Sequence, residues 1–351
     1  MLMVIFGAGA SYDSCPTYPP GTDVPTSNGL DRLNHHYRPP LANELFANRP
    51  HFADTIERYP DCQPIIPRLR SLAGETLEVV LEDLQTKAEA YARGRRQMAA
   101  VRCYLGEVIS TCDSLWSRVS KGITNYKSLL DQIERTHPKE QVCLVTFNYD
   151  TLLEDALRHF GLPITNFDDY TRRHPFFRIF KLHGSTNWAR EIETNARIEV
   201  GDDPYKVFAQ LMEHWDEIHI TDRYLFGFGG SLGVGLGKPT FPAIAIPVEK
   251  KRSFECPQHM IDELTALLPQ VTKILVIGWR ATENHFLELL QRHLSWGRAL
   301  PAYIVAGNQN QAEEVKGLIH HAVPGLLSSA EVSVGFTAFM LSGRAQAILS
   351  I

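Results

Sequence analysis

Features of metal-binding and membrane proteins are scarce in this sequence. Only six of its 351 residues are cysteine, and no two of them form a Cys-x-x-Cys pair, so a structural zinc ribbon is not expected. No apolar run approaches the roughly 20 residues that a membrane-spanning helix needs. The amino-terminal run also lacks the charged segment and cleavage site of a secretory signal. We therefore expect a cytoplasmic protein with free thiols and no membrane segment.

An excess of positive charge is also missing. The chain has 35 Lys and Arg against 40 Asp and Glu, a formal net charge of -5, whereas proteins that bind duplex nucleic acid usually carry a basic surplus. Direct nucleic-acid binding is therefore not expected. The arginines at 93, 95 and 96 are typical of a solvated helix face. Hydrophobic residues at 44% and charged residues at 21% indicate a globular protein, and the length permits two domains.

What the sequence does contain is a series of short apolar runs, each ending in a polar or glycine-containing turn. They cover residues 2–6, 141–147, 178–182, 273–277 and 302–306. Each run is typical of a buried strand, and helical spacing follows several of them. This alternation predicts an α/β fold, with a Rossmann-like, mostly parallel sheet and helices on both faces.

One long stretch lacks strand signals. Between residues 70 and 135, apolar residues recur at helical spacing. We therefore predict a helical insertion at 49–135 inside a discontinuous Rossmann-like domain made of residues 1–48 and 136–351. The insertion is a candidate surface for docking or oligomerisation.

Three further stretches show no clear period. Residues 12–40 are rich in Pro, Gly, Asn and Asp, and a loop of that length is uncommon unless it is functional. We hypothesise that it acts as a lid that excludes bulk water. Residues 190–240 are rich in glycine and are interpreted as irregular. Residues 331–351 mix strand and helix signals and are not placed.

Glycines and polar side chains follow every predicted strand. In chain order they are Gly7, Gly9 and Ser11, Asn148 and Asp150, His183 and Ser185, Gly278 and Trp279, and Asn308. Ligands of open parallel sheets bind beyond the carboxyl ends of the strands. The fold should gather these residues along one edge, and this convergence predicts a functional site there.

The residue types at this edge suit a nucleotide, although each has a structural alternative. The glycines after residue 6 would let backbone N–H groups approach a diphosphate, but they are equally typical of a tight turn. Asn148 and Asp150 together can hold an amide, which offers both a donor and an acceptor, while Asp150 alone suits helix capping. Only Asp31 has about the spacing of the acid of a dehydrogenase fingerprint. It lies in the irregular loop, so an ordinary dehydrogenase is disfavoured.

Three motifs in this order resemble those of sirtuins. Residues 146–150 (TFNYD) resemble the sirtuin Thr-Gln-Asn-Ile-Asp segment, residues 181–185 (KLHGS) the catalytic histidine-glycine motif, and residues 7–11 (GAGAS) the Gly-Ala-Gly-x-Ser turn. Two departures stand out. Phe147 replaces the glutamine, and Cys256 is the only cysteine after His183, so the four-cysteine zinc module of the deacylases is missing. Both departures resemble the bacterial sirtuin-like proteins of antiphage defence, such as the Thoeris NADase subunit and the sirtuin-like partners of HerA-type ATPases.

The resemblance implies NAD+ as the substrate, without zinc, and its hydrolysis to nicotinamide and ADP-ribose in abortive antiphage defence. It implies that Asn148, which orients the ribose or a water, and His183, the general base, are the catalytic residues. The implied NAD+-binding residues are Gly7, Ala8, Gly9 and Ser11 at the diphosphate, Asp150 at the carboxamide, Gly184, Ser185 and Gly278 beside them, and Asn308 at the adenosine ribose. Glu283 and Asn284 begin a helix after Gly278 and Trp279, and we assign these two residues to capping that helix.

An assembly is implied as well, because an unrestrained NADase would deplete the host's own NAD+. We expect a homo-oligomer and a partner such as a HerA-type ATPase. Three other functions stay open. They are an NAD-dependent protein deacylase or ADP-ribosyltransferase, a non-catalytic NAD+ or ADP-ribose sensor that regulates a partner, and an unrelated α/β enzyme.

Overall fold

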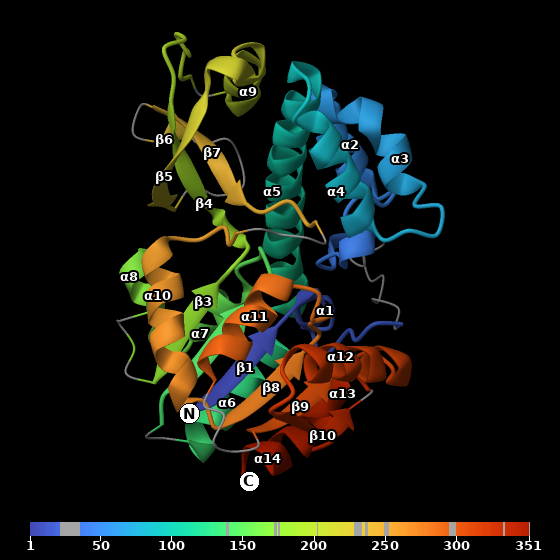
Figure 1. Ribbon diagram of the computed structural model, residues 1–351, viewed down its shortest axis with the longest axis vertical. Coiled ribbons are helices and arrows are strands. Elements are labelled where there is room, and N and C mark those ends of the chain that lie inside the picture. Colours follow the sequence, from blue (N-terminus) through green and yellow to red (C-terminus); the bar gives the residue numbers. More distant parts are fainter. Residues whose placement is uncertain are drawn as a thin grey trace. The chain divides into compact units, whose positions relative to one another are not determined.

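A six-stranded sheet organises one part of the chain in the computed structural model (Figure 1). The strand order is β10-β9-β8-β1-β2-β3, and every neighbouring pair is parallel. The strands are β1 (Leu2–Phe6), β2 (Val142–Thr146), β3 (Phe177–Lys181), β8 (Lys273–Ile277), β9 (Leu300–Val305) and β10 (Leu326–Val332). The predicted α/β fold with a mostly parallel sheet is confirmed, and the five predicted strands agree with the structure to within two residues.

The central strands are apolar on both faces because helices cover the sheet. β1, β2 and β8 are buried at every position, the pattern of a parallel strand with both sides protected. The helices of this part are α1 (Ala8–Tyr12), α6 (Asn125–Thr136), α7 (Leu152–Arg158), α8 (Phe167–Thr171), α10 (Gln258–Leu267), η5 (Leu268–Gln270), α11 (Asn284–His293), α12 (Gln309–Ala322), α13 (Gly335–Leu341) and α14 (Arg344–Leu349).

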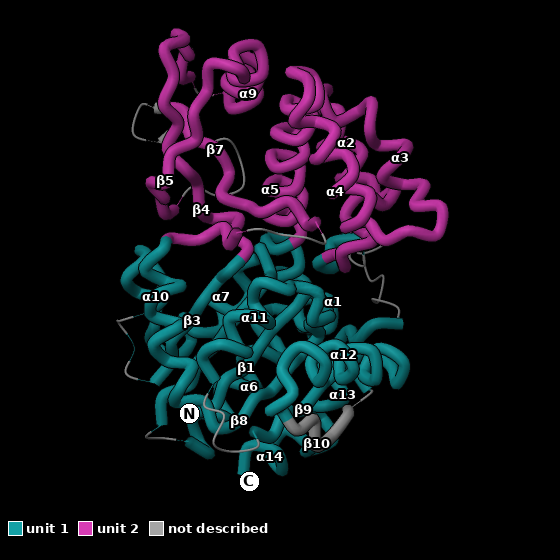
Figure 2. The backbone as a smooth tube through the Cα atoms, viewed as in Figure 1, with its two compact units in different colours: residues 1–39, 113–182, 258–351 teal, residues 40–112, 183–257 magenta. Residues whose placement is uncertain are grey.

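The chain divides into two compact units, coloured teal and magenta in Figure 2. Unit 1 comprises Met1–Pro39, Asp113–Leu182 and Gln258–Ile351, and unit 2 comprises Pro40–Cys112 and His183–Pro257. The structure describes all residues except 22–35, 138–139, 172–173, 175, 202, 228–233, 236–237, 249–252, 295–299, 333 and 351. About half of the hypothesised lid, residues 22–35, therefore lies outside the described residues, as does Asp31.

Unit 2 combines helices with an antiparallel sheet of order β5-β4-β7-β6. The interpretation of residues 190–240 as irregular is wrong. Register shifts inside β4 break its period-two pattern, and two prolines in β7 hide a strand. The elements are η2 (Ala42–Glu44), α2 (Pro50–Arg58), η3 (Pro60–Ile65), α3 (Ile66–Arg70), α4 (Leu77–Ala88), α5 (Ala92–Ser120, shared with unit 1), β4 (Gly184–Glu193), α9 (Pro204–Glu213), η4 (Trp215–Glu217), β5 (His219–Phe226), β6 (Val234–Gly235) and β7 (Lys238–Ile244).

A buried carboxylate explains why the segment after His183 groups with the early helices. Glu107 on α5 accepts hydrogen bonds from the hydroxyls of Tyr59 (2.8 Å) and Tyr205 (3.0 Å). It also pairs with Arg58 at the end of α2. Because Tyr205 lies on α9, one carboxylate ties α9 to α2 and α5.

The compact units do not follow the predicted domain ranges. Residues 49–135 are helical, as expected, but α6 packs against α7, α13 and α14 of unit 1. Helical periodicity identifies a helix without indicating its neighbours. Within the described residues, no helix combines the length and apolarity needed to cross a bilayer. All six cysteines are buried and free.

Candidate active site

The strands of unit 1 end at a common level. Phe6, the last residue of β1, pairs with Thr146 on one side and Ile277 on the other, and Thr146 pairs with Lys181. The ladder runs one residue further, since the Phe147 N–H donates to Phe6 O at 3.0 Å. The turns that begin at Gly7, Asn148 and Gly278 therefore lie on one edge, as the sequence predicts for these residues.

Two of these turns are packed backbone against backbone. A Cβ on Gly7 would lie 2.5 Å from the Cα of Trp279, and one on Gly278 would lie 2.3 Å from Ala10 N. Gly9 is equally restricted, because its Cβ would lie 2.8 Å from the Gly278 Cα. Gly278 also has a φ of +61°, a conformation that side chains disfavour. Contact between the turns is thus a reason for all three glycines.

This packing uses two of the amides that the sequence assigned to a diphosphate. The Gly7 N–H donates to Ile277 O and the Gly9 N–H to Gly278 O, both at 3.0 Å. Among the described residues, the Ala8 N–H between them has no recorded acceptor. Ala8 is therefore the one residue of this trio whose amide stays available.

Asn148 is held by its amide nitrogen. Nδ2 donates toward Gly7 O (2.9 Å), Ser11 Oγ (2.8 Å) and Tyr126 OH (3.1 Å), and the side chain is buried. Gly7 O can only accept, so the nitrogen end of the carboxamide faces the first turn. The oxygen end of Asn148 points the other way.

Asp150 lies two residues further, and its carboxylate has two kinds of partner. Oδ1 accepts from the Leu152 N–H at 3.2 Å, which satisfies an orphan donor at the start of α7, as the capping alternative predicted. Ser11 donates a hydrogen bond to the same carboxyl group. Ser11 is buried and so joins Asn148 to Asp150.

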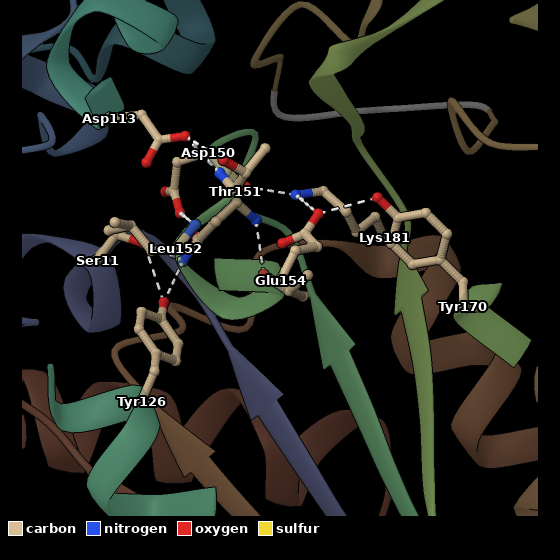
Figure 3. Close-up of polar contacts among 11 residues, drawn as sticks. Ser11, Asp113, Tyr126, Asp150, Thr151, Leu152, Glu154, Tyr170 and Lys181 are labelled. Carbon is tan, nitrogen blue, oxygen red and sulfur yellow. Dashed lines mark hydrogen bonds and ion pairs between the residues drawn. The ribbon is translucent and has the colours of Figure 1, made fainter. Parts of the chain in front are cut away.

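A buried acidic network surrounds this loop (Figure 3). Lys181 at the end of β3 donates to the Asp150 carbonyl and pairs with Glu154 Oε1 at 2.9 Å. Tyr170 donates to the same Glu154 oxygen at 3.0 Å. On the other side, Asp113 Oδ2 accepts from the Thr151 N–H (2.8 Å) and hydroxyl (2.6 Å).

Burial raises the pKa of two of these carboxyl groups, Asp113 and Asp150. Burial raises the pKa of Asp113 to about 7, with the Asp150 charge adding to the effect. The pKa of Asp150 is also raised by burial, against the opposing effects of Lys181 and Ser11. Lys181 pairs with Glu154 and lowers the pKa of Asp150, so a proton on Asp113 reduces the negative charge that this cation has to balance.

Aromatic side chains line the same strand ends. Phe147 stacks on Trp279, with ring centroids 5.3 Å apart and planes 10° from parallel, and Phe286 meets both rings edge-on. Trp279 Nε1 donates to Glu283 Oε2 at 2.5 Å. Glu283 occupies the N-cap position of α11, as assigned, but its side chain makes no capping hydrogen bond there and accepts from this tryptophan instead.

The predicted site residues that follow β3 and β9 have contacts of their own. His183, Gly184 and Ser185 belong to unit 2, where all three are buried. His183 O accepts from the Ala245 N–H at 3.0 Å. Gly184 has a φ of +84°, and a Cβ there would lie 1.9 Å from Ala243 O. Asn308 Oδ1 caps α12 by accepting from the Gln311 N–H at 3.0 Å, so its contact with a ribose stays a prediction.

Sequence reasoning missed Asp113, Tyr126 and Lys181. Asp113 and Tyr126 lie on α5 and α6, inside the predicted insertion, where only apolar periodicity was considered. Lys181 sat unremarked within the KLHGS motif. A charged last residue of a buried strand is unusual, and that signal was available.

Comparison with known proteins places the chain in a family. A family model described as a SIR2-like domain matches residues 142–321, and no curated protein matches the chain. Similar solved structures include a mutant Sir2 homologue in complex with 2'-O-acetyl ADP-ribose, at 14% identity over 100% of this chain and 93% of that chain, with a TM-score of 0.40. Another is Sir2 with a p53 peptide and NAD+, at 11% identity over 99% of this chain and 93% of that chain, with a TM-score of 0.38.

Within the described residues, no group of three or more His, Cys, Asp or Glu side chains is arranged to hold a metal ion. The acidic network therefore carries no metal assignment. The family model spans just over half of the chain, and the protein belongs to the SIR2-like domain family.

Proposed function

We propose that this protein is a sirtuin-like NAD+ glycohydrolase that cleaves NAD+ to nicotinamide and ADP-ribose, with water as the acceptor. The observation that carries the proposal is the position and hydrogen bonding of Asn148 in a chain of the SIR2-like domain family. It follows a central strand, and its amide nitrogen is committed to the first turn. We further propose that the reaction serves abortive antiphage defence within a homo-oligomer or with a partner such as a HerA-type ATPase.

Asn148 is suited to bind a donor on the substrate. Its nitrogen end faces Gly7 O, so the carboxamide oxygen is the end turned away from the turn. An oxygen acceptor matches a ribose hydroxyl or a water molecule. Orienting either group for attack at the anomeric carbon is a positional contribution to the rate.

The acidic network favours the charge that develops during the reaction. Nicotinamide leaves as a neutral molecule, and positive charge builds on the ribose in an oxocarbenium-like transition state. Asp150 ends the loop that begins at Asn148, and Lys181 pairs with Glu154 while lowering the pKa of Asp150. Preorganised charge of the opposite sign lowers the energy of such a transition state.

The remaining roles are proposed from the sequence motifs. His183 is the general base that acts on water or on a ribose hydroxyl. The Ala8 N–H, which has no recorded acceptor among the described residues, supplies a donor to the diphosphate. Gly7, Gly9 and Gly278 keep the two turns in contact beside it.

The test measures nicotinamide release by purified full-length protein from NAD+, with and without an acylated peptide. We expect release without the peptide and one ADP-ribose for each nicotinamide. Asn148→Ala and His183→Ala should each lower kcat by about 100-fold or more, the usual scale for a lost catalytic group. His320→Ala is the matched control, because His320 is exposed on α12 and should leave kcat unchanged.

If the enzyme is held inactive until phage infection, its activity is measured in infected cells. Cellular NAD+ should fall during phage infection with the wild-type protein and stay constant with Asn148→Ala. Release that requires the acylated peptide would indicate a deacylase instead. Binding of NAD+ without release in either setting would indicate a sensor.

A further inference from the structure

A tyrosine outside the three motifs reaches the candidate site. The Tyr126 hydroxyl on α6 lies 2.9 Å from Ser11 Oγ and 3.1 Å from Asn148 Nδ2. Figure 3 shows the Tyr126 and Ser11 side chains pointing toward one another. The side chain is 1% exposed. Both of its polar partners are predicted site residues, whereas nothing in the sequence singles out Tyr126.

The phenol ring is fixed between neighbours. Its centroid lies 5.1 Å from the Phe6 ring and 5.7 Å from the Phe336 ring. Burial raises the pKa of Tyr126 well above its ordinary value, so the hydroxyl keeps its proton. The hydroxyl is therefore a fixed group that both donates and accepts one hydrogen bond.

The donors and acceptors of this cluster allow one continuous arrangement. Asn148 Nδ2 has two hydrogens, and one of them goes to Gly7 O, which can only accept. Either hydroxyl can donate the hydrogen bond between Ser11 and Tyr126. With Tyr126 as the donor, the Ser11 hydrogen is left for Asp150, whose pKa Ser11 lowers. Tyr126 can then accept the second hydrogen of Asn148. The chain of hydrogen bonds runs from Asn148 through Tyr126 and Ser11 to Asp150.

We propose that Tyr126 is a positioning residue of the NAD+-cleaving site, whose hydroxyl holds the Asn148 carboxamide with its oxygen turned toward the substrate. The inference rests on the proposed function. It deepens that function by naming a residue that acts on the reaction through Asn148. Without the hydroxyl, the second hydrogen of the Asn148 amide loses its Tyr126 acceptor, and Ser11 Oγ is the acceptor left beside Gly7 O.

The test is Tyr126→Phe, which removes one oxygen and keeps the ring between Phe6 and Phe336. We expect kcat for nicotinamide release to fall about 2- to 13-fold, the scale of one lost hydrogen bond. In an Asn148→Ala background, adding Tyr126→Phe should cause no further loss, because the group it positions is gone. The affinity for ADP-ribose, measured by calorimetry, should show the same non-additivity.

The matched control is Tyr104→Phe. Tyr104 is also fully buried, and its hydroxyl makes one hydrogen bond, to Leu45 O at 2.9 Å. Both variants should lose similar stability on thermal unfolding, but Tyr104→Phe should keep wild-type kcat. This comparison separates positioning from a general effect of losing a buried hydroxyl.

Each outcome decides between the two proposals. If Tyr126→Phe keeps the wild-type kcat and ADP-ribose affinity, this inference alone is overturned. It is also overturned if the fold-losses of Tyr126→Phe and Asn148→Ala multiply in the double variant. If the wild type binds ADP-ribose without releasing nicotinamide, the hydrolase proposal fails and the affinity cycle still decides the role of Tyr126. A wild type that neither binds nor cleaves overturns both.

Discussion

Lys181 is a buried cation whose partners all lie around the Asn148–Asp150 loop. Its side chain is 1% exposed, it donates to Asp150 O, and it pairs with Glu154 at 2.9 Å. Glu154 Oε2 is itself buried and has no hydrogen-bond partner among the described residues. Removing one member of such a pair leaves an uncompensated charge in a medium that solvates it poorly.

We therefore expect Lys181→Met to lower the free energy of unfolding by about 3–5 kcal/mol, the usual cost of breaking a buried pair. Urea denaturation at pH 7 measures the change. Arg158→Met is the control, since Arg158 pairs with Asp155 while 71% exposed, and such a pair contributes about 0–1 kcal/mol. Adding Glu154→Gln to Lys181→Met should restore part of the loss. Equal effects of the Lys181 and Arg158 changes would contradict the buried-charge account.

For single residues, the sequence predicts a member of the candidate site only where a recognisable motif contains that residue. Asn148, Asp150 and Ser11 follow strands, and the structure places them in one network. Tyr126 and Asp113 reach that network from helices that the sequence separates from it by 20 or more residues. Periodicity shows which side of a helix is apolar, but not which polar group a buried hydroxyl or carboxyl meets.

At the scale of elements, the turns after β1 and β8 are in close backbone contact, so the conformation of each restricts the other. Gly7, Gly9 and Gly278 exclude side chains from their contact, with a Cβ approach of 2.3 Å at Gly278. The Gly9 N–H donates across the contact to Gly278 O. This contact sets the position of α1, whose Ser11 bonds to Asn148.

Gly278→Ala should consequently destabilise the protein by at least about 2 kcal/mol. The cost combines a left-handed backbone conformation, about 1–2 kcal/mol for a side chain, with displacement of the Ala10 backbone. Gly317→Ala on α12 is a control of opposite sign, because its Cβ would meet nothing within 4 Å and alanine stabilises a helix interior by roughly 0.5–1 kcal/mol. Thermal unfolding of both variants provides the measurement, and a neutral Gly278→Ala would refute the interlocked turns.

Five of the six strands of unit 1 were predictable from the sequence, whereas the strands of unit 2 were not, and the difference has a physical reason. A parallel strand with both faces covered is a continuous apolar run, such as residues 2–6. β5 buries only one of its eight residues, and β4 carries register shifts. A partly exposed or bulged strand gives neither a continuous apolar run nor a regular alternation. The interpretation of residues 190–240 therefore rested on their glycines and prolines.

For the whole molecule, the carboxyl groups with a resolved shift bear on how stability varies with pH. Burial raises the pKa of Asp13, Asp113, Asp150 and Asp155 in the described part of the chain. An acid with a raised folded-state pKa keeps its proton in the folded protein after the unfolded chain has lost it. Stability then falls as pH rises from the unfolded pKa to the folded one. His174 acts in the opposite direction, because burial lowers its pKa.

Asp113 isolates this effect, because burial and Asp150 raise its pKa from 3.8 to about 7, with Asp155 also facing it and the Thr151 hydrogen bonds opposing. Between those pH values its ionisation should reduce the free energy of unfolding by up to about 1.4 kcal/mol per pH unit. Asp113→Asn mimics the protonated form, so urea denaturation at pH 5, 6 and 7 should give a smaller decline with rising pH than in the wild type. Glu134→Gln, exposed on α6, should leave the wild-type slope unchanged. Identical slopes for Asp113→Asn and the wild type would mean that Asp113 is ionised throughout this range, and that the network tolerates its full negative charge beside Asp150.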